Sequence, residues 1–203
     1  MKKSLPLLLA LCALLGSPFA AHALVYQFNA TLNGPSEVPS TASTATGIAS
    51  LQYDDHGTAS LLDDTYSFSE AVFGLSGPAT GYHIHAAASS TETGPVRINF
   101  ASTPGYLVTV SGNNVLVGAA NLPAPAIPAT PSSSSNAGYP AMSFLAVLQN
   151  GLAYVNVHTA SYPGGEVRGQ LLQVSAVPEP GTSALLLAGA GVIGMAARRR
   201  LKR

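Results

Sequence analysis

The most constraining feature of this sequence is the alternation of apolar and polar residues in short runs. In "LVYQFNATLNG", Tyr26, Phe28, Ala30 and Leu32 alternate with polar residues, which is the period of a β-strand with one buried face. Comparable runs are "GIASLQYDDHGTASL", "TYSFSEAVFGLSG", "GYHIHAAA", "GPVRINF", "YLVTVSG", "LAYVNVHT" and "EVRGQLLQV". Roughly eight strands with turn residues between them predict an all-β domain, either a Greek-key β-sandwich or a flattened barrel.

Two segments between these runs have a different pattern. Residues 121–140 are rich in proline and serine, so we expect a long mobile loop inside the domain. The run from Met142 to Gln149 has the apolar spacing of one short helix, which Gly151 would end. Alternatively, Asn150 and Gly151 could close a β-hairpin; the helix is the preferred interpretation.

The first 23 residues have the three parts of a secretory signal peptide. Lys2 and Lys3 precede an apolar run, and Ala21-His22-Ala23 supplies the small residues of a cleavage site. The run is too short for a membrane-spanning helix, so we expect cleavage after Ala23. The sole cysteine, Cys12, lies in this segment, so the exported domain has no disulfide and no thiol chemistry.

The C-terminal residues 178–203 form a second special segment. Pro178-Glu179-Pro180 is followed by an uncharged stretch to Ala197 and then by a cluster of arginine and lysine. As a helix, Pro180–Ala197 would be roughly 27 Å long, close to a hydrocarbon core of about 30 Å. The basic end should stay in the cytoplasm and the main domain outside it. A packed core helix is the alternative, which the adjacent cations disfavour.

This tail closely resembles the PEP-CTERM sorting signal of Gram-negative bacteria, which combines a Pro-Glu-Pro motif, a short transmembrane helix and a basic end. The resemblance implies that an exosortase recognises Pro178, Glu179 and Pro180, and that cleavage nearby removes the helix, so that the membrane is contacted only transiently. It also implies delivery to the cell surface or exterior, often in organisms that form biofilms. The expected organisation is a signal peptide (1–23), a β domain (24–177) and a sorting signal (178–203).

The charge of the predicted exported domain differs from that of the whole chain, which is neutral with nine cations and nine acids. Between residues 24 and 177 only Arg97 and Arg168 remain, against eight acidic residues, so two minus eight gives a net charge of −6. An acidic domain binds nucleic acid or anionic polysaccharide poorly through bulk charge. We therefore expect no nucleic-acid partner.

Residues 25–172 resemble the CHRD domain, which was named from the animal protein chordin and also occurs in exported bacterial proteins. The resemblance is carried by "FNATLNGPSEVPSTASTATGIASLQYDDHG", "GYHIHAAA", "TGPVRINF" and "GLAYVNVHTASYPGGEVRGQL". The sequence departs from the family where Ala86-Ala87-Ala88 and Thr93 replace glycines and an asparagine. The resemblance implies an immunoglobulin- or superoxide-dismutase-like fold, but no established bacterial activity.

The histidines of these motifs suggest a metal site. His83 and His85 lie two apart on a predicted strand, so both side chains project from one face about 6.6 Å apart along the chain. His158 could supply a third ligand if its strand is a neighbour, and Glu166 is the nearest candidate carboxylate. Three imidazoles and a carboxylate suit zinc or copper. The set does not suggest a copper–zinc dismutase, which needs further imidazoles, because only His56 in a turn remains.

The alternative is a buried polar network, since histidine can both donate and accept hydrogen bonds between strands. Glu166 and Arg168 would be its partners, and their spacing predicts an ion pair on one strand face. Asn156, Gly164, Gly165 and Arg168 belong to the same motif. The two glycines are expected to turn the chain at positive φ.

No pattern of a known catalytic site is present, such as Gly-x-Ser-x-Gly or a glycine-rich phosphate loop. The sequence therefore predicts a non-enzymatic, exported protein with a structural or adhesive role at the cell surface or in the extracellular matrix. Its expected partners are the exosortase and export machinery, with exopolysaccharide or surface proteins as further candidates. The alternative function is zinc or copper binding through the His-x-His strand.

Overall fold

The computed structural model describes residues 24–174 of the chain. The signal peptide predicted over residues 1–23 and the sorting segment predicted over 178–203, with its transmembrane helix, lie outside these residues. Within residues 24–174, no helix is both long enough and apolar enough to cross a membrane. The elements are β1 (Val25–Asn33), η1 (Gly34–Ser36), β2 (Thr46–Asp54), β3 (Thr65–Phe73), β4 (Ala79–Ala86), β5 (Val96–Asn99), β6 (Leu107–Ser111), β7 (Asn114–Pro123), β8 (Ala126–Ile127), β9 (Met142–Ser143), α2 (Phe144–Gln149), β10 (Ala153–Thr159), β11 (Val167–Gln170) and β12 (Leu172–Gln173).

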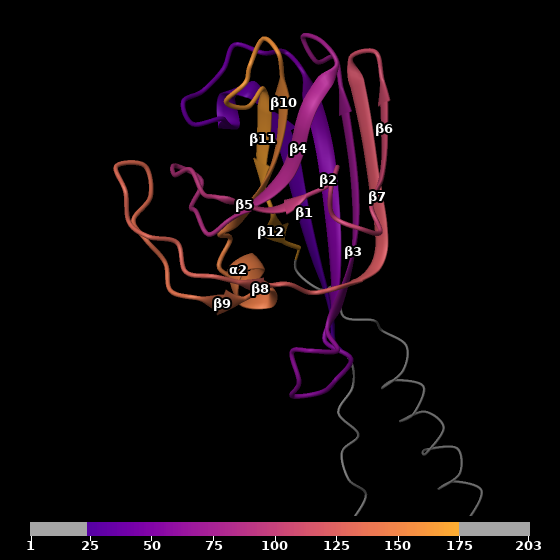
Figure 1. The fold of residues 1–203 in the computed structure, drawn as a ribbon, viewed down its shortest axis with the longest axis vertical. Helices are drawn as coiled ribbons and strands as arrows, with labels where there is room; N and C mark the ends of the chain where they lie inside the picture. The colour runs from indigo at the N-terminus through magenta and orange to yellow at the C-terminus, as the bar shows by residue number, and fades with distance from the viewer. Residues whose placement is uncertain (1–23, 175–203) are drawn as a thin grey trace, which may run out of the picture.

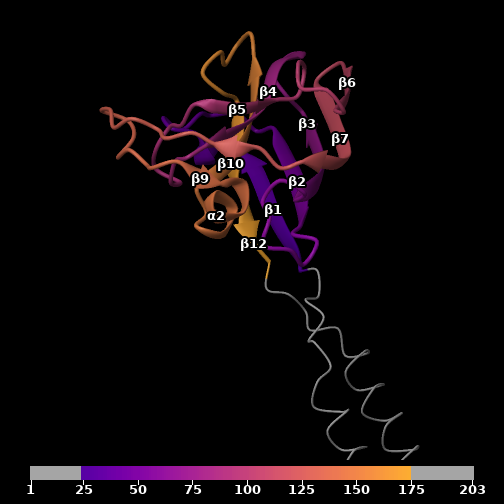
Figure 2. The ribbon, with the colours of Figure 1, turned by 60° about the horizontal axis from the view of Figure 1, so that its bottom comes forward.

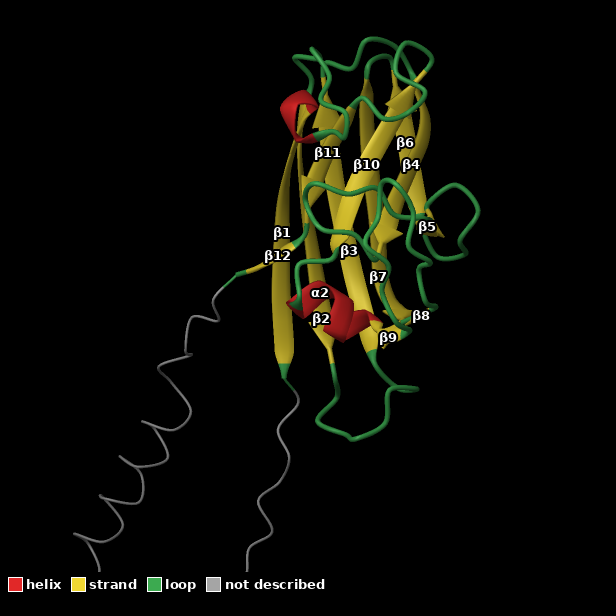
Figure 3. Ribbon diagram, turned by 90° about the vertical axis from the view of Figure 1, so that its left-hand side faces the viewer, coloured by secondary structure: helices red, strands yellow, loops and turns green. Residues whose placement is uncertain are grey.

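One antiparallel sheet holds every described strand except β8 and β9, which pair with each other. Its strands follow the order β5-β4-β10-β11-β1-β2-β3-β7-β6, and β12 also pairs with β1. The sheet curls so that β4, β5, β10 and β11 lie across from β2, β3 and β7 (Figures 1 and 3). The predicted all-β fold is confirmed, in the form of a half-barrel built from a single sheet.

The core lies inside the curl and follows from the alternation in the sequence. β1, β2 and β3 bury every second residue over most of their length. Phe28, Leu51 and Phe68 lie in one row across these strands, and Phe68 packs against Phe100, just after β5, with ring centroids 4.9 Å apart. Each large apolar side chain removed from water in this way stabilises the fold by about 1.5–3 kcal/mol.

Strand β10 differs from the others because it is covered on both faces. Six of its seven residues are buried, and the exception, His158, is half-buried. Val155 and Val157 belong to the core, whereas Tyr154, Asn156 and His158 project from the opposite face. Loops around residues 34–43, 87–95 and 160–166 hydrogen-bond to this outer region. A polar face thus becomes enclosed without being part of the apolar core.

The short helix predicted from Met142 onward is α2, preceded by the two-residue strand β9. Ser143 caps the helix by accepting a hydrogen bond from the Ala146 amide at 3.1 Å, and Gly151 follows it with a φ of +63°. α2 packs beside β9 and β12 (Figure 2). Its residues Phe144, Val147 and Leu148 are buried.

The expectation of an irregular loop over residues 121–140 is only partly correct. β7 extends to Pro123, and β8 forms within the segment. Asn136 is buried and donates hydrogen bonds of 2.9 Å to the carbonyls of Ala87 and Thr93. Buried side-chain donors satisfied by backbone carbonyls fix this segment against the body of the domain, which composition alone does not indicate.

Both ends of the described chain lie at one end of the half-barrel. Val174 donates its amide proton to the carbonyl of Gln27 at 2.8 Å, next to the start of β1. The turn between β10 and β11 lies at the opposite end (Figure 1).

Candidate metal centre

The three histidines singled out in the sequence come together on the outer face of β4 and β10. Strand pairing places His83 opposite Asn156 and His85 opposite Tyr154, with His158 opposite Gly81. The ring centroid of His83 lies 5.5 Å from that of His85 and 5.1 Å from that of His158. One ligand atom from each histidine lies within 4.8 Å of the other two. We call these residues the three-histidine cluster.

A glycine at position 81 makes room for this arrangement. A Cβ at Gly81 would lie 2.9 Å from Cε1 and 3.5 Å from Nε2 of His83. The same Cβ would lie 3.4 Å from Cδ2 of His158, the ring carbon bonded to Nε2. Cε1 and Nε2 of His83 and Cδ2 of His158 therefore lie close to one another beside Gly81.

Backbone carbonyls hold two of the rings by their other nitrogen. His85 Nδ1 lies 2.8 Å from the Gly94 carbonyl, and His158 Nδ1 lies 3.0 Å from the Pro163 carbonyl. A carbonyl oxygen can only accept, so Nδ1 carries the proton in both rings and Nε2 keeps its lone pair. Both Nε2 atoms are buried and have no hydrogen-bond partner among residues 24–174. Nδ1–H bonded to a carbonyl with Nε2 free is the arrangement that orients histidine toward a metal.

The cluster is electrically neutral near pH 7. Burial lowers the pKa of both His83 and His85 to about 4, with a further contribution from neighbouring imidazoles. Burial also lowers the pKa of His158. A desolvated imidazole resists protonation, and the neutral form is the one that binds metal ions.

The donor set fits a zinc or copper ion after a small adjustment. With metal–nitrogen distances of about 2.0–2.1 Å and tetrahedral angles, ligand nitrogens would lie about 3.4 Å apart. In the structure the ligand nitrogens lie within 4.8 Å of one another. Small rotations of the rings, which move each nitrogen by on the order of 1 Å, would therefore bring them to the distances that an ion requires.

The carboxylate of Glu166 lies outside this group of ligand atoms. It accepts hydrogen bonds from the hydroxyls of Ser43, Ser76 and Thr159 at 2.8, 2.7 and 2.5 Å, and from the Ser76 amide at 2.7 Å. Burial raises the pKa of Glu166, but these hydrogen bonds outweigh that effect and lower it. The charged carboxylate joins the β3–β4 connection to the end of β10.

The ion pair predicted between Glu166 and Arg168 is not formed. Within the described residues, no arginine lies at salt-bridge distance from a carboxylate, and the one contact at that distance joins the His56 ring and Asp54, at 3.8 Å. The buried guanidinium of Arg168 instead lies 3.4 Å from the centre of the Tyr154 ring and donates to the carbonyls of Ser89 and Glu92. Hydroxyl groups already surround the Glu166 carboxylate, so the arginine is used for cation–π stacking and loop anchoring.

Tyr154 connects Arg168 to the three-histidine cluster. The ring of His85 is stacked on that of Tyr154, with centroids 4.7 Å apart and planes 6° from parallel. Because β10 lies between β4 and β11, the order across the sheet is imidazole, phenol ring, guanidinium. In the sequence, Tyr154 and His158 are four residues apart on one predicted strand, which places both side chains on the same face of the sheet.

Glu37 is a member of the site that no pattern in the sequence indicated. Its Oε1 accepts a hydrogen bond of 2.5 Å from Nδ2 of Asn156, which is 119 residues away in the chain. Burial raises the pKa of Glu37 to about 7, although Arg168 opposes the shift. Glu37 and Arg168 also line a cleft of about 460 Å³.

The glycine turn before β11 is confirmed at one of its two predicted positions. Gly165 has a φ of +131°, whereas Gly164 is not among the residues with positive φ. A Cβ on Gly165 would lie 2.5 Å from Nδ2 of Asn156 and 2.6 Å from Oε1 of Glu37. Gly165 thus allows the Glu37–Asn156 hydrogen bond to form against the backbone.

Comparison with known proteins supports both resemblances found in the sequence, that of the C-terminal sorting signal and that of the β domain. Residues 176–200 match the PEP-CTERM protein-sorting motif. This motif marks the chain for processing by an exosortase, with export across the inner membrane and a surface or extracellular location after processing. No curated protein and no solved structure matches the chain.

The family model of the CHRD domain matches residues 28–171, from the buried Phe28 of β1 to Leu171 beside β12. This range contains all three histidines, Glu37 and the Asn156–Arg168 motif. The chain therefore belongs to the CHRD domain family.

Proposed function

We propose that this exported CHRD domain binds a transition metal ion through His83, His85 and His158. The observation that carries the proposal is the convergence of three neutral imidazoles, of which His85 and His158 each have a buried Nε2 with no hydrogen-bond partner among the described residues. Leaving such atoms unbonded is unfavourable. A metal ion would satisfy both Nε2 atoms at once.

The ligand chemistry favours zinc or copper. Imidazole nitrogen suits both ions, whereas calcium and magnesium take oxygen ligands. With three neutral protein ligands, a fourth position would remain for water or an exogenous ligand. His83 and His158 are only half-buried, so part of each of these residues is exposed to solvent.

Metal analysis of the processed protein purified from producing cells tests the proposal. After equilibration with zinc or copper and removal of free ion, we expect about one ion per chain. A His83→Ala/His85→Ala variant should lose it. The matched control is His56→Ala, since His56 lies in the turn after β2 and its Nε2 lies 3.0 Å from the Thr65 hydroxyl. A folded unmodified protein without metal above background would remove the proposal.

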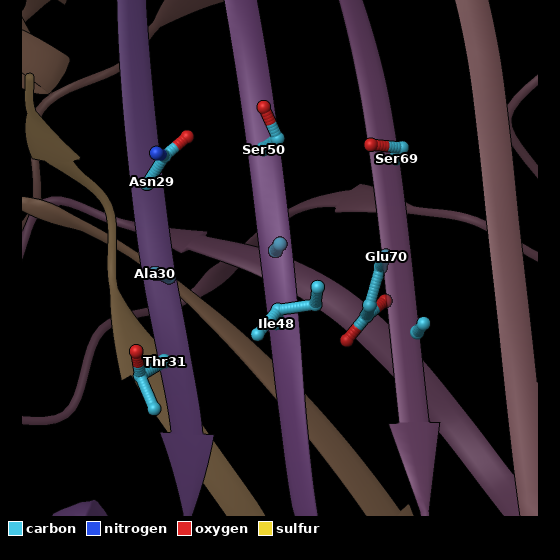
Figure 4. Close-up of a pocket in the computed structure, with 9 residues that line it drawn as sticks. Asn29, Ala30, Thr31, Ile48, Ser50, Ser69 and Glu70 are labelled. Carbon is cyan, nitrogen blue, oxygen red and sulfur yellow. The ribbon is translucent and has the colours of Figure 1, made fainter.

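We propose in addition a structural or adhesive role at the cell surface, which the outer face of β1, β2, β3, β7 and β6 supports. Asn29, Ser50 and Ser69 lie side by side across three strands and line a groove of about 390 Å³ (Figure 4). The next row contains the exposed Ile48, and Leu116 and Leu107 are exposed on β7 and β6. Exposed apolar side chains gathered on one face are typical of interaction surfaces.

The edge strand β6 strengthens this second proposal. Its sequence, LVTVS, has no charge and no proline, although such residues normally protect exposed sheet edges from pairing. A Thr109→Lys substitution on β6 should weaken cell-surface retention or self-association, measured by fractionation and by sedimentation. An unchanged variant would argue against a role for this edge.

We further propose that the role is non-enzymatic. Glu166, Glu37 and Arg168 are each occupied by hydrogen bonds within the protein. These contacts suit a structural framework around the cluster better than proton transfer to a substrate.

A further inference from the structure

Two buried polar atoms that should be partnered lie on directly opposed residues. His83 on β4 and Asn156 on β10 are paired in the strand register. His83 Nδ1 and Asn156 Oδ1 are both buried, and neither has a hydrogen-bond partner among residues 24–174. Directly opposed residues have Cβ atoms about 4.5–5.5 Å apart. Each of these two atoms is two bonds from its Cβ, so rotation of the side chains can bring them within hydrogen-bond reach of each other.

The orientation of the Asn156 amide is fixed from its other side. Its Nδ2 donates to Oε1 of Glu37 at 2.5 Å, and the ionised carboxylate, the form of Glu37 above its pKa of about 7, can only accept. Oδ1 is therefore the end of the amide that remains free, and it can only accept. The donor that it lacks is an N–H.

His83 is the only member of the cluster without a hydrogen bond on its Nδ1. The Nδ1 atoms of His85 and His158 are bonded to the carbonyls of Gly94 and Pro163. Cε1 and Nε2 of His83 lie beside Gly81, where Cδ2 of His158 also lies. If His83 followed the other two rings, its Nδ1 would carry a proton and its Nε2 would face the metal.

We propose that Asn156 is a positioning residue for the metal centre: its Oδ1 accepts a hydrogen bond from Nδ1–H of His83, so that all three histidines present Nε2 to the ion. Glu37 acts one step further out by holding the amide of Asn156. The positioning role rests on the proposed metal site, whereas the hydrogen bond is expected in the metal-free protein as well.

The protonation of His83 can be measured directly, without any substitution. Two-bond ¹⁵N–¹H correlation spectra of the ¹⁵N-labelled, metal-free protein near pH 7 distinguish the two neutral forms of each histidine. We expect the Nδ1–H form for all three members of the cluster. A His83 ring protonated on Nε2 would overturn the proposal, whether or not the protein binds metal.

Substitution of Asn156 tests its effect on the ion. Asn156→Leu keeps the size of the side chain but removes the acceptor, and should weaken copper or zinc binding by about 10–100-fold. It should also change the copper electron paramagnetic resonance spectrum, because one imidazole is no longer held. Asn156→Asp combined with Glu37→Gln retains an acceptor toward His83 and a donor–acceptor pair between the two side chains, and should recover the native spectrum and most of the affinity.

The outcomes separate the two proposals. An unmodified protein that binds no metal removes the metal-binding function, while the histidine spectra still decide on the hydrogen bond. If the unmodified protein binds metal and a folded Asn156→Leu variant has the same affinity and spectrum, Asn156 has no positioning role. If that variant does not fold, the spectra of the unmodified protein alone decide.

Discussion

At the scale of single residues, Glu70 is the least expected feature of the core. It lies on the inward face of β3, in register with Ala49 and Val117, and is only 4% exposed. Neither carboxylate oxygen has a hydrogen-bond partner among the described residues. Burial raises the pKa of Glu70 to about 8, so the side chain is protonated in the folded protein at neutral pH.

Glu70 should therefore make stability fall as the pH rises. Its folded pKa is higher than the ordinary value of 4.5, so its contribution is complete below pH 4.5 and is lost between about pH 4.5 and 8. The expected slope is about 1.4 kcal/mol per pH unit within this window. Glu70→Gln should remove the contribution of Glu70 to the slope, so that the stability of the variant relative to the unmodified protein rises from pH 5 to pH 8. Urea unfolding at pH 5, 6, 7 and 8 measures this, and equal slopes for both proteins would contradict it.

The two neighbouring glycines of the β10–β11 turn provide a second prediction with an internal control. Gly165→Ala would place a Cβ at positive φ and against Asn156 and Glu37, and should cost about 1–3 kcal/mol of folding free energy. At Gly164 a Cβ meets nothing within 4 Å, so Gly164→Ala should change stability little. Thermal unfolding of both variants compares them; similar losses would show that the turn does not depend on Gly165.

At the scale of elements, the sequence pattern predicted individual strands and the short helix, because these depend on neighbouring residues. Alternation indicated β1 and β2, and the apolar spacing from Met142 indicated α2, because strand and helix periods act over neighbouring residues. The same alternation put His83 and His85 on one face. His158 joins them only because β4 pairs with β10. The sequence did not show whether these two strands are neighbours.

Other contacts depend on distant chain segments and could not be predicted. Glu37 reaches Asn156 across 119 residues, and the hydroxyls of Ser43 and Ser76 reach Glu166 across 123 and 90 residues. These contacts explain why the expected Glu166–Arg168 ion pair is absent. Residue spacing within one strand does not show which loops will cover that strand.

The segment over residues 121–140 allows a prediction at the same scale. Asn136→Ala removes two hydrogen bonds that hold the segment to Ala87 and Thr93, and should destabilise the domain by about 1–3 kcal/mol. It should also speed proteolytic cleavage within the segment. Ser134→Ala, at an exposed position, is the control. Equal cleavage rates for the two variants would mean that Asn136 does not anchor the segment.

At the scale of the whole molecule, the arginines of the exported domain are used internally. Arg97 donates to the carbonyls of Ala86 and Pro128, and Arg168 is buried over Tyr154. No other lysine or arginine occurs between residues 24 and 177. The outer surface over residues 24–174 is therefore acidic or neutral, which disfavours nucleic acid as a partner.

The sorting motif gives a prediction for the complete chain. Replacing Pro178, Glu179 and Pro180 with alanine should block exosortase processing, so that the protein keeps its C-terminal segment. Mass spectrometry of the product and cell fractionation would show a heavier, membrane-bound form. The His56→Ala variant serves as the control, since it leaves the motif intact. Normal release of the alanine variant would contradict a sorting role for the motif.

The placement of the two ends of the described chain has a consequence for how the domain meets its surroundings. Residue 175 continues from the end of the half-barrel where Val174 bonds to Gln27, whereas β10 carries His158 toward the far end. A chain still held by its C-terminal segment would therefore have His158 at one end of the half-barrel and the attachment of that segment at the other. Loading of the three-histidine cluster with an ion would then not require prior release of the protein by the exosortase.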